Sequence, residues 1–168
     1  MQRFPAPVRN LLFICMDTVR ADVFYGLGDL DKKDALADWR DSALDFTQVT
    51  ATSPWTVPAI GSALTGLWPY AHGAGRFPDP IAELGTQAPV PAHEDTTFLT
   101  EVAERRGFNT AVFSASAWTY NPFLSMGLLR GFDEVVQYET NWQPMVSEMI
   151  HSFAEQIDDG RNFSTCCI

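Results

Sequence analysis

The sequence predicts an α/β fold in which a mostly parallel sheet is sandwiched between helices. Two apolar runs, at 10–16 and 108–116, have the length and composition of buried strands. Two further segments, at 98–107 and 143–157, repeat their apolar residues at helical spacing. Strands that alternate with helices along a chain are typical of parallel sheets with helical crossovers, and this alternation sets the predicted class.

The first strand is expected in NLLFICM, residues 10–16, whose unbroken apolar run suits a strand buried on both faces. DFTQVTA, residues 45–51, alternates and is rich in β-branched residues, which predicts a short strand. Between these two strands lies a charge-rich stretch in which apolar residues at helical spacing predict a helix: Ala35, Leu36, Trp39 and Ala43.

The next helix is expected to have Pro58 at its first position and to end at Gly66. The fixed φ and missing N–H of proline suit the first turn, and glycine suits the left-handed residue that follows a helix. Residues 73–95 contain clusters of glycine and proline and little periodicity, so a long loop is predicted there.

The second half of the chain continues the alternation. A helix in 98–107 is predicted to end at Gly107. After the strand at 108–116 come a short strand in 131–138 and an amphipathic helix that starts near Pro144. The cap of the first of these helices is expected among three polar residues: Asp95, Thr96 or Thr97.

Composition and charge limit the function classes. The 168 residues carry 21 acidic and 11 basic side chains, a formal net charge of −10, which argues against a nucleic acid or an anionic membrane as the partner. The apolar run before Asp17 is too short for a signal peptide or a membrane span, so a soluble, cytoplasmic chain is expected. The cysteines are expected to form neither a disulfide framework nor a metal motif: Cys15, Cys166 and Cys167.

Asp17 directly follows the first predicted strand. Ligands of parallel α/β sheets bind outside the carboxyl ends of the strands, so an aspartate at this position can hold a metal ion. A turn residue or a helix cap is the simpler interpretation of a single aspartate at a strand end. Asp22, further along, can equally be a solvated carboxylate.

Thr56 lies just before the predicted helix start at Pro58. The unpaired N–H groups and the positive dipole end of a helix favour an oxyanion such as phosphate or sulfate. A hydroxyl there can attack the bound group if a divalent cation lowers its pKa, although a plain helix cap is the alternative. His72 can bind an anion or sit in a surface loop. Other polar candidates are interpreted as structural, packing or exposed residues: Ser62, Thr65, His93 and His151.

Two linked motifs resemble the sulfatase-like branch of the alkaline phosphatase superfamily. NLLFICMDTVRADVFYG is similar to that family's first strand, metal-binding aspartate and following Arg-Ala-Asp. SPWTVPAIGSALTGLWPYAHG is similar to its nucleophile helix, with the TG-x-x-P and HG that follow it. TFLTEVAERRGFNTAVFSAS and RGFDEVV fit the same order, so the resemblance runs over residues 9–160.

The resemblance implies an alkaline-phosphatase-like fold and a metal-dependent hydrolase of sulfate or phosphate esters. By position, Asp17 would ligate a divalent cation (Ca, Zn or Mn), Thr56 would be the nucleophile and a second ligand, and His72 would bind substrate. The implied substrate is a small-molecule, glycan or lipid ester. Among the superfamily's members, phosphodiesterases and phosphotransferases are a further possibility.

Several positions depart from the family's pattern. Formylglycine sulfatases carry Cys or Ser within a Cys/Ser-x-Pro-x-Arg motif, whereas this chain has Thr56 and, in place of the arginine, Ile60. Thr18 replaces the second aspartate of the usual pair, and the family's later lysine and histidine are replaced by small residues at 114–117. Threonine is the usual nucleophile of the superfamily's phosphodiesterases and phosphotransferases, which keeps phosphoryl chemistry open.

Three segments are expected: an N-terminal arm at 1–8, the N-terminal portion of a sulfatase-like catalytic domain at 9–161, and an aberrant or truncated tail at 162–168. An α/β chain should enter another apolar strand after Gly160, but RNFSTCCI follows, so the alternation is expected to be cut off there. The family's remaining metal ligands lie beyond the matched stretch. A catalytically inactive fragment or pseudoenzyme is therefore the alternative to an active hydrolase.

Overall fold

The computed structural model describes these stretches of the chain: residues 10–25, 42–77, 89–116, 126–138, 142–158 and 163–167. The chain divides into two compact units, of which the larger combines Met1–Cys15 with Thr52–Ile168 and the smaller is Met16–Ala51. The predicted arm at 1–8 and the helix predicted around Trp39 lie outside the described residues.

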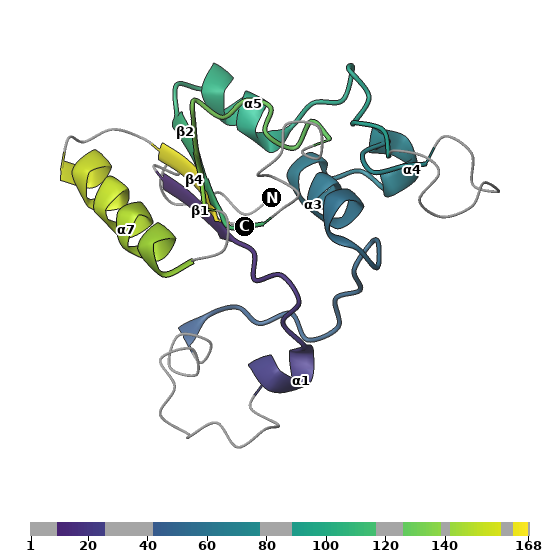
Figure 1. The fold of residues 1–168 in the computed structure, drawn as a ribbon, viewed down its shortest axis with the longest axis horizontal. Helices are drawn as coiled ribbons and strands as arrows, with labels where there is room; N and C mark the ends of the chain where they lie inside the picture. Colours follow the sequence, from purple (N-terminus) through teal and green to yellow (C-terminus); the bar gives the residue numbers. More distant parts are fainter. Residues whose placement is uncertain are drawn as a thin grey trace, which may run out of the picture. The chain divides into compact units, whose positions relative to one another are not determined.

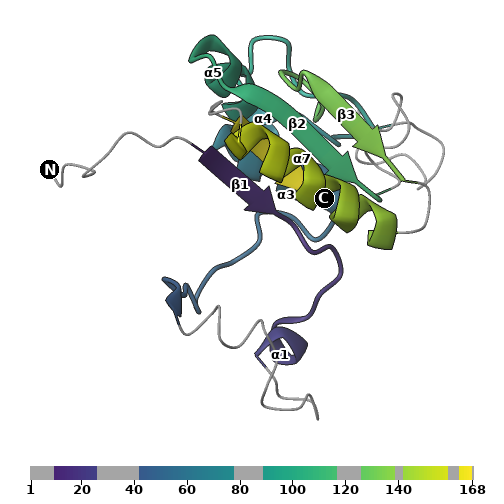
Figure 2. The same ribbon diagram turned by 90° about the vertical axis from the view of Figure 1, so that its left-hand side faces the viewer.

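A four-stranded sheet runs through the larger unit in the strand order β1-β4-β2-β3 (Figure 1 and Figure 2). Every neighbouring pair of strands is parallel, which confirms the prediction of an α/β fold with a parallel sheet. The strands are β1 (Asn10–Ile14), β2 (Asn109–Ser114), β3 (Glu134–Gln137) and β4 (Phe163–Cys167).

Helices pack on both faces of this sheet. On β2, Val112 packs in a cluster with Val57 of α3, while Phe113 packs in another with Met149 of α7. Because successive strand residues point to opposite faces, α3 and α7 lie on opposite sides of β2, as Figure 1 shows. The helices of the larger unit are α3 (Thr56–Thr65), α4 (Pro69–His72), α5 (Leu99–Arg105) and α7 (Trp142–Asp158).

The long connections between strands follow the rules of parallel sheets. β1 reaches β2 by way of α3 and α5, whereas β3 reaches β4 by way of α7 on the other face. The first connection passes over the position of β4, and the second returns past β2. Since they cross in opposite directions on opposite faces, both have the same hand, as expected for crossovers of this kind.

The expectation that β1 is buried on both faces is wrong. Leu12 and Ile14 are 46% and 53% exposed, while Phe13 packs against the core cluster of α3. β1 lies at one edge of the described sheet, whereas α7 packs on β2.

The expectation that the alternation stops after Gly160 is also wrong. Residues Phe163–Cys167 form β4, which lies between β1 and β2. Leu12 of β1 and Ala111 of β2 are both paired with Thr165. Although FSTCC is less apolar than a usual central strand, its position between two neighbours satisfies its backbone groups on both sides.

The short strand predicted in 45–51 is not formed, because these residues are turn and irregular backbone. Phe46 and Val49 are 68% and 74% exposed. A strand needs a neighbour to pair with, and the sheet of the described residues contains no segment of the smaller unit. Among the described residues of the smaller unit, Ala21–Phe24 form the short helix α1.

The helix predicted from Pro58 begins two residues earlier, at Thr56, and Pro58 is its third residue. Proline is tolerated there because the first four N–H groups of a helix have no intrahelical partner. The predicted end is confirmed, since Gly66 follows the helix with φ +71. In the predicted loop at 73–95, Arg76 and Val90 form an isolated antiparallel bridge, and 78–88 lie outside the described residues.

α5 is not capped by Asp95, Thr96 or Thr97 as expected. Its N-cap is Phe98, whose backbone N–H donates to Glu101 Oε2 at 2.9 Å. A carboxylate three residues into the helix thus takes over the task of a capping side chain. The predicted end at Gly107 is confirmed by its φ of +79. No helix in the described part of the chain is long and apolar enough to cross a membrane.

Candidate functional site

Thr56, the predicted nucleophile, is the first residue of α3 and is partly buried. Trp55 precedes it in extended conformation, with φ −141 and ψ 161, as the residue before a helix should be. The first intrahelical bond runs from Ala59 N–H to Trp55 C=O at 3.4 Å, so the N–H groups of Thr56 and Val57 precede it. They lie at the positive end of a ten-residue helix, which is a favourable place for an oxyanion.

His72, the predicted substrate-binding residue, is fully buried at the end of α4. Its Nδ1 accepts a hydrogen bond from Ala74 N–H at 3.0 Å, and its Nε2 lies 3.1 Å from Ser62 Oγ in α3. Both ring nitrogens therefore have protein partners. This environment favours a role inside the protein over direct contact with a substrate anion.

The environment of His72 stabilises its neutral form. Burial holds its pKa below the ordinary histidine value, a hydrogen bond with the Pro58 backbone opposes this shift, and nearby His93 adds to it. Because Ala74 N–H donates to Nδ1, the proton of the neutral ring is on Nε2, which donates to Ser62 Oγ. Ser62 is 7% exposed, in agreement with the packing role expected from the sequence. It is in addition a hydrogen-bond partner of the His72 ring.

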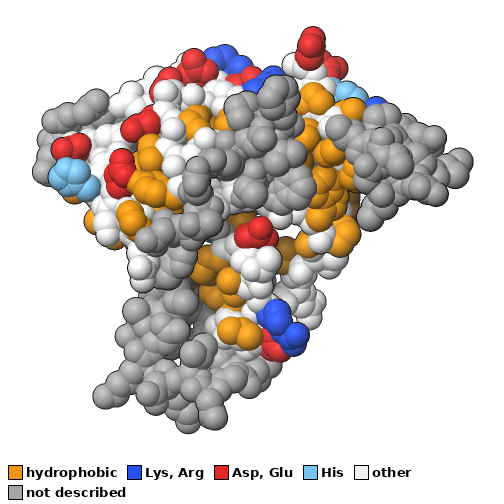
Figure 3. Space-filling model, viewed as in Figure 1, with side chains coloured by type: hydrophobic (Ala, Val, Ile, Leu, Met, Phe, Trp, Pro, Cys, Tyr) orange, Lys and Arg blue, Asp and Glu red, His pale blue; other side chains and the backbone are white. Residues whose placement is uncertain are grey.

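A cavity of about 270 Å³ lies beside the first turn of α3. Its lining includes Trp55 and Pro58, which come before and after Thr56 in the sequence. Arg76 is the one cationic side chain among its lining residues. Trp55 also stacks on Phe77, with ring centroids 6.1 Å apart. The other lining residues are Ser53, Pro69, Tyr70, Ala74 and Gly75. Apolar side chains gather over the α3 and α4 side of the molecule in Figure 3.

Gly75 has to be glycine for this cavity wall to form. Its φ is +75, and an added Cβ would lie 2.8 Å from the Trp55 ring and 3.0 Å from Pro58 Cδ. The backbone of the segment after α4 therefore packs directly on the residues that flank Thr56. The sequence contained this signal only as a glycine among others.

Asp17, the predicted metal ligand, lies in an exposed turn of the smaller unit, whereas Thr56 and His72 belong to the larger unit. Thr18, which replaces the family's second aspartate, has φ +61, an uncommon conformation for a β-branched residue. Asp22 is engaged by Arg20, whose Nε donates to Asp22 Oδ1 at 2.8 Å. This bond from Arg20 lowers the pKa of Asp22 below its ordinary value.

The described residues do not by themselves provide a complete cation site. Asp17 and Thr56 supply two oxygen donors, whereas Ca²⁺ takes six to eight and Zn²⁺ four. No group of three or more His, Cys, Asp or Glu side chains suited to a metal ion occurs among the residues that the structure describes. A divalent cation bound by Asp17 and Thr56 would thus need ligands beyond these two.

Two further family positions have structural roles here. Ile60, at the position of the sulfatase arginine, is 5% exposed and packs in the core cluster of α3. Ser114, near the position of the later lysine and histidine, is buried at the end of β2, and its Oγ accepts a hydrogen bond from Ser116 N–H at 3.1 Å. Neither position can provide a positively charged side chain to the site.

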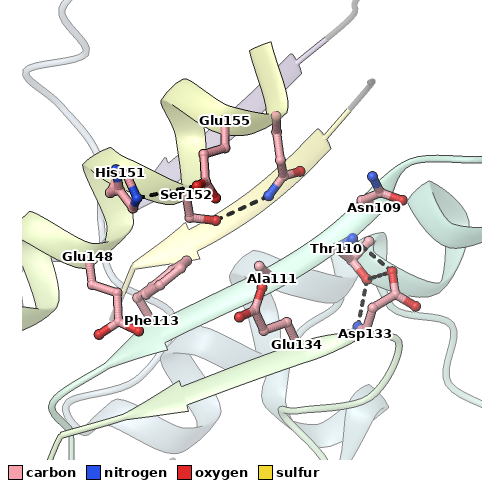
Figure 4. A pocket seen from close by; sticks show the side chains of 11 residues that line it. Asn109, Thr110, Ala111, Phe113, Asp133, Glu134, Glu148, His151, Ser152 and Glu155 are labelled. Carbon is pink, nitrogen blue, oxygen red and sulfur yellow. Dashed lines mark hydrogen bonds and ion pairs between the residues drawn. The ribbon is translucent and has the colours of Figure 1, made fainter. Parts of the chain in front are cut away.

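A second cavity, of about 490 Å³, lies between α7 and the amino ends of β2 and β3 (Figure 4). Its lining includes Asp133, Glu148 and Glu155 together with His151, which is 3.3 Å from Glu155. Acidic and histidine side chains also gather over α7 in Figure 3. An acidic lining repels an anionic ester, and ligands of parallel sheets bind at the carboxyl ends of the strands. This cavity is therefore not the candidate site.

The comparison with protein families found a match that covers most of the chain. The family model described as Sulfatase matches residues 9–160, a stretch that contains Asp17, Thr56 and His72. No curated protein sequence matches the chain.

Proposed function

This chain belongs to the sulfatase family, and from that membership we propose that it contributes to a hydrolase of sulfate or phosphate esters in which Thr56 is the nucleophile. The observation that carries the proposal is the place of Thr56 as the first residue of α3. A hydroxyl at the positive end of a helix is close to where a bound oxyanion is stabilised. Hydrolase chemistry is what membership of this family indicates.

The proposed reaction uses Thr56 in two steps. Thr56 Oγ forms a bond to the phosphorus or sulfur atom as the bond to the ester oxygen breaks, and the hydroxyl proton and the departing oxygen together give the free alcohol. Water then hydrolyses the covalent intermediate and restores the threonine. The N-terminal amides of α3 would stabilise the negative charge of the transferred group.

We further propose that Asp17 and Thr56 are two of the ligands of a divalent cation, Ca²⁺, Zn²⁺ or Mn²⁺. Such a cation would lower the pKa of the attacking hydroxyl. Asp17 is exposed in a turn directly after the carboxyl end of β1, which suits a ligand. Since two donors do not complete the coordination of these cations, the proposal requires additional ligands.

Phosphate esters are the favoured substrate class. Thr56 replaces the Cys or Ser that formylglycine chemistry needs, and Ile60, in the core, replaces the arginine. Phosphodiesterase or phosphotransferase chemistry, for which threonine is the usual nucleophile in this superfamily, fits these residues better than sulfatase chemistry. The cavity beside Trp55, with Tyr70 and Arg76 in its wall, suits the organic part of an anionic ester.

The test is hydrolysis of 4-nitrophenyl phosphate, bis(4-nitrophenyl) phosphate and 4-nitrophenyl sulfate, each with Ca²⁺, Mn²⁺ or Zn²⁺ added. The proposal expects turnover of the phosphate esters that Thr56→Ala abolishes and Thr56→Ser partly retains. Turnover that survives Thr56→Ala would contradict the role of Thr56, and preferred turnover of the sulfate ester would contradict the substrate class.

The alternative is a catalytically inactive fragment or pseudoenzyme. It is favoured because the described residues contain no group of three or more His, Cys, Asp or Glu side chains suited to a metal ion. Calorimetric titration with the three cations separates the two proposals. Dissociation constants weaker than millimolar, together with no turnover of any of the three esters, support the alternative, and micromolar binding lost in Asp17→Asn supports the hydrolase.

A further inference from the structure

We infer that His72 is the positioning residue of α3: its neutral ring, protonated on Nε2, bridges Ser62 in α3 and the backbone of Ala74 and so holds the helix that begins at Thr56. The bridge stands on the geometry of the larger unit alone. Its consequence for Thr56 rests on the proposed function.

The bridge adds hydrogen bonds between two segments that also pack together, since Ala74 belongs to the same core cluster as Ile60 and Leu64 of α3. Ser62 is in the second turn of α3, and Ala74 follows α4 by two residues. The ring lies between them with 3.1 Å from Nε2 to Ser62 Oγ and 3.0 Å from Ala74 N to Nδ1. His72 is 0% exposed, so neither bond competes with water.

The surrounding backbone is shaped to admit the ring. A Cβ on Gly61 would lie 2.8 Å from His72 Cε1 and 3.1 Å from Nδ1. The imidazole therefore lies directly against the backbone of α3, at a distance that only glycine allows. Pro58, whose backbone also bonds with His72, is one helical turn before Ser62, so the ring contacts the first turn of α3 as well.

The neutral ring suits this site better than the protonated ring does. A protonated Nδ1 would point its hydrogen at Ala74 N–H, which is itself a donor, and one hydrogen bond of the bridge would be lost. The segment of α3 carries no charged side chain, α4 contributes Tyr70, and the following turn contributes Arg76. His93, in the segment after Val90, lies near the ring: its backbone N–H donates to His72 C=O at 2.9 Å, and a positive charge on His93 disfavours a second one on His72. Among the described residues, no carboxylate forms a hydrogen bond with the ring that would stabilise its positive charge.

The bridge therefore couples the protonation state of His72 to the placement of α3. When His72 is neutral, α3 and the segment after α4 are tied together, and the Thr56 end of the helix is held beside the cavity wall formed by Gly75. When the ring is protonated, the tie is broken at Ala74. The folded-state pKa is depressed, so the stabilisation is complete above the ordinary histidine pKa and is lost as the pH falls through the folded-state pKa.

The experiment combines ¹⁵N NMR of the histidine rings with amide hydrogen exchange, and neither needs a substrate. The bridge requires an Nε2-protonated ring of His72 whose pKa lies below the ordinary histidine value. Ser62→Ala should speed exchange of the α3 amides about five- to tenfold, the size expected for one lost hydrogen bond, and leave the α7 amides unchanged. His72→Gln, which keeps a donor toward Ser62, should restore part of the protection that His72→Ala loses.

An Nδ1-protonated ring, a pKa of His72 at or above the ordinary histidine value, or unchanged α3 exchange in Ser62→Ala would overturn the inference. His151→Gln is the matched control and should alter neither readout in α3. Unchanged α7 exchange shows that a variant has folded. If the bridge is found but no ester is hydrolysed, only the proposed function fails; if Thr56-dependent turnover is found with kcat unaffected by Ser62→Ala, only the inference about positioning fails.

Discussion

The guanidinium of Arg130 lies 2.8 Å from Glu101 Oε1, and this ion pair joins the turn before β3 to the first turn of α5. Arg130 Nη2 also donates to the carbonyl of Thr96 at 2.8 Å, and Nη1 to that of His93 at 3.1 Å. The guanidinium lies 5.0 Å from the ring centroid of Phe98, a core residue. One side chain thus satisfies the backbone that leads into α5.

Arg130→Ala should lower the free energy of unfolding by about 2 kcal/mol, because the carbonyls and the Glu101 carboxylate lose charged donors at a partly buried site. Urea unfolding followed by circular dichroism measures the change. Arg106→Ala, at an exposed arginine just after α5, is the control and should change it by less than about 0.5 kcal/mol. Equal effects of the two substitutions would show that the interaction network of Arg130 is not stabilising.

Glu101 should make the stability of the larger unit depend on acid pH. Burial opposes ionisation of Glu101, but the Phe98 N–H and Arg130 outweigh it and hold its pKa below the ordinary value. The stabilisation is therefore full above the ordinary glutamate pKa and is lost as the pH falls through the folded-state pKa. The difference in melting temperature between the native chain and Glu101→Gln should shrink as the pH falls below about 4.5. A constant difference would contradict this linkage.

Thr56→Ala should lower kcat for the preferred ester by about 10³-fold or more, since removal of a nucleophile abolishes the covalent route. Thr56→Ser keeps the hydroxyl and should retain measurable turnover. Circular dichroism of both variants checks that α3 is intact. A fall in kcat that is equal in the two variants would indicate that the methyl group, rather than the hydroxyl, is what matters at this position.

Thr18→Asp should both relax the backbone and strengthen cation binding. Aspartate adopts the left-handed conformation of residue 18 more readily than a β-branched residue does, and it restores a carboxylate next to Asp17. We expect the dissociation constant for Ca²⁺ to fall about tenfold, because affinity rises with the number of carboxylate ligands. Thr47→Asp, at an exposed turn residue of the same unit, controls for added negative charge. Equal tightening by both would reduce the effect to general electrostatics.

Tyr70→Ala and Arg76→Gln should raise KM for 4-nitrophenyl phosphate several-fold and leave its kcat less affected. Both side chains line the cavity beside α3, and Tyr70 is 79% exposed, so its removal should not disturb the core. Inorganic phosphate as a competitive inhibitor distinguishes the two. Arg76→Gln should weaken its binding, whereas Tyr70→Ala should not, because the aromatic ring is proposed to contact only the organic part.

The apolar periodicity and the positions of glycine and proline in the sequence predict much of this fold. β2, β3, α5 and α7 lie where the apolar patterns place them, and the glycines after α3 and α5 have positive φ as expected. These features are local, and local propensity decides them. The strand predicted in 45–51 fails for a non-local reason, since alternation cannot supply a neighbouring strand. A non-local cause also explains β4: its sequence is polar, but it forms a central strand because β1 and β2 lie on either side of it.

The candidate site was predictable to a similar extent. The position of Thr56 at the start of α3 followed from Pro58 and Gly66 to within two residues. The environment of His72 did not, because the glycine beside it and its hydroxyl partner are ten or more residues away, in another helix. The local sequence around His72 does not distinguish a ring that faces solvent from one that is buried against the backbone of α3.

The place of β4 has a consequence for the order in which the chain can assemble. Asn10 pairs with Phe163, so the first described strand has to wait for a partner more than 150 residues later in synthesis. On the ribosome, β2, β3 and their helices can dock early, whereas β1 remains an unpaired, partly apolar ribbon until β4 is inserted beside it. Such long-range closure slows folding and leaves a sticky nascent segment exposed for longer. Deletion of Phe163–Cys167 should therefore detach β1 from the sheet, although β1 is far from these residues in the sequence.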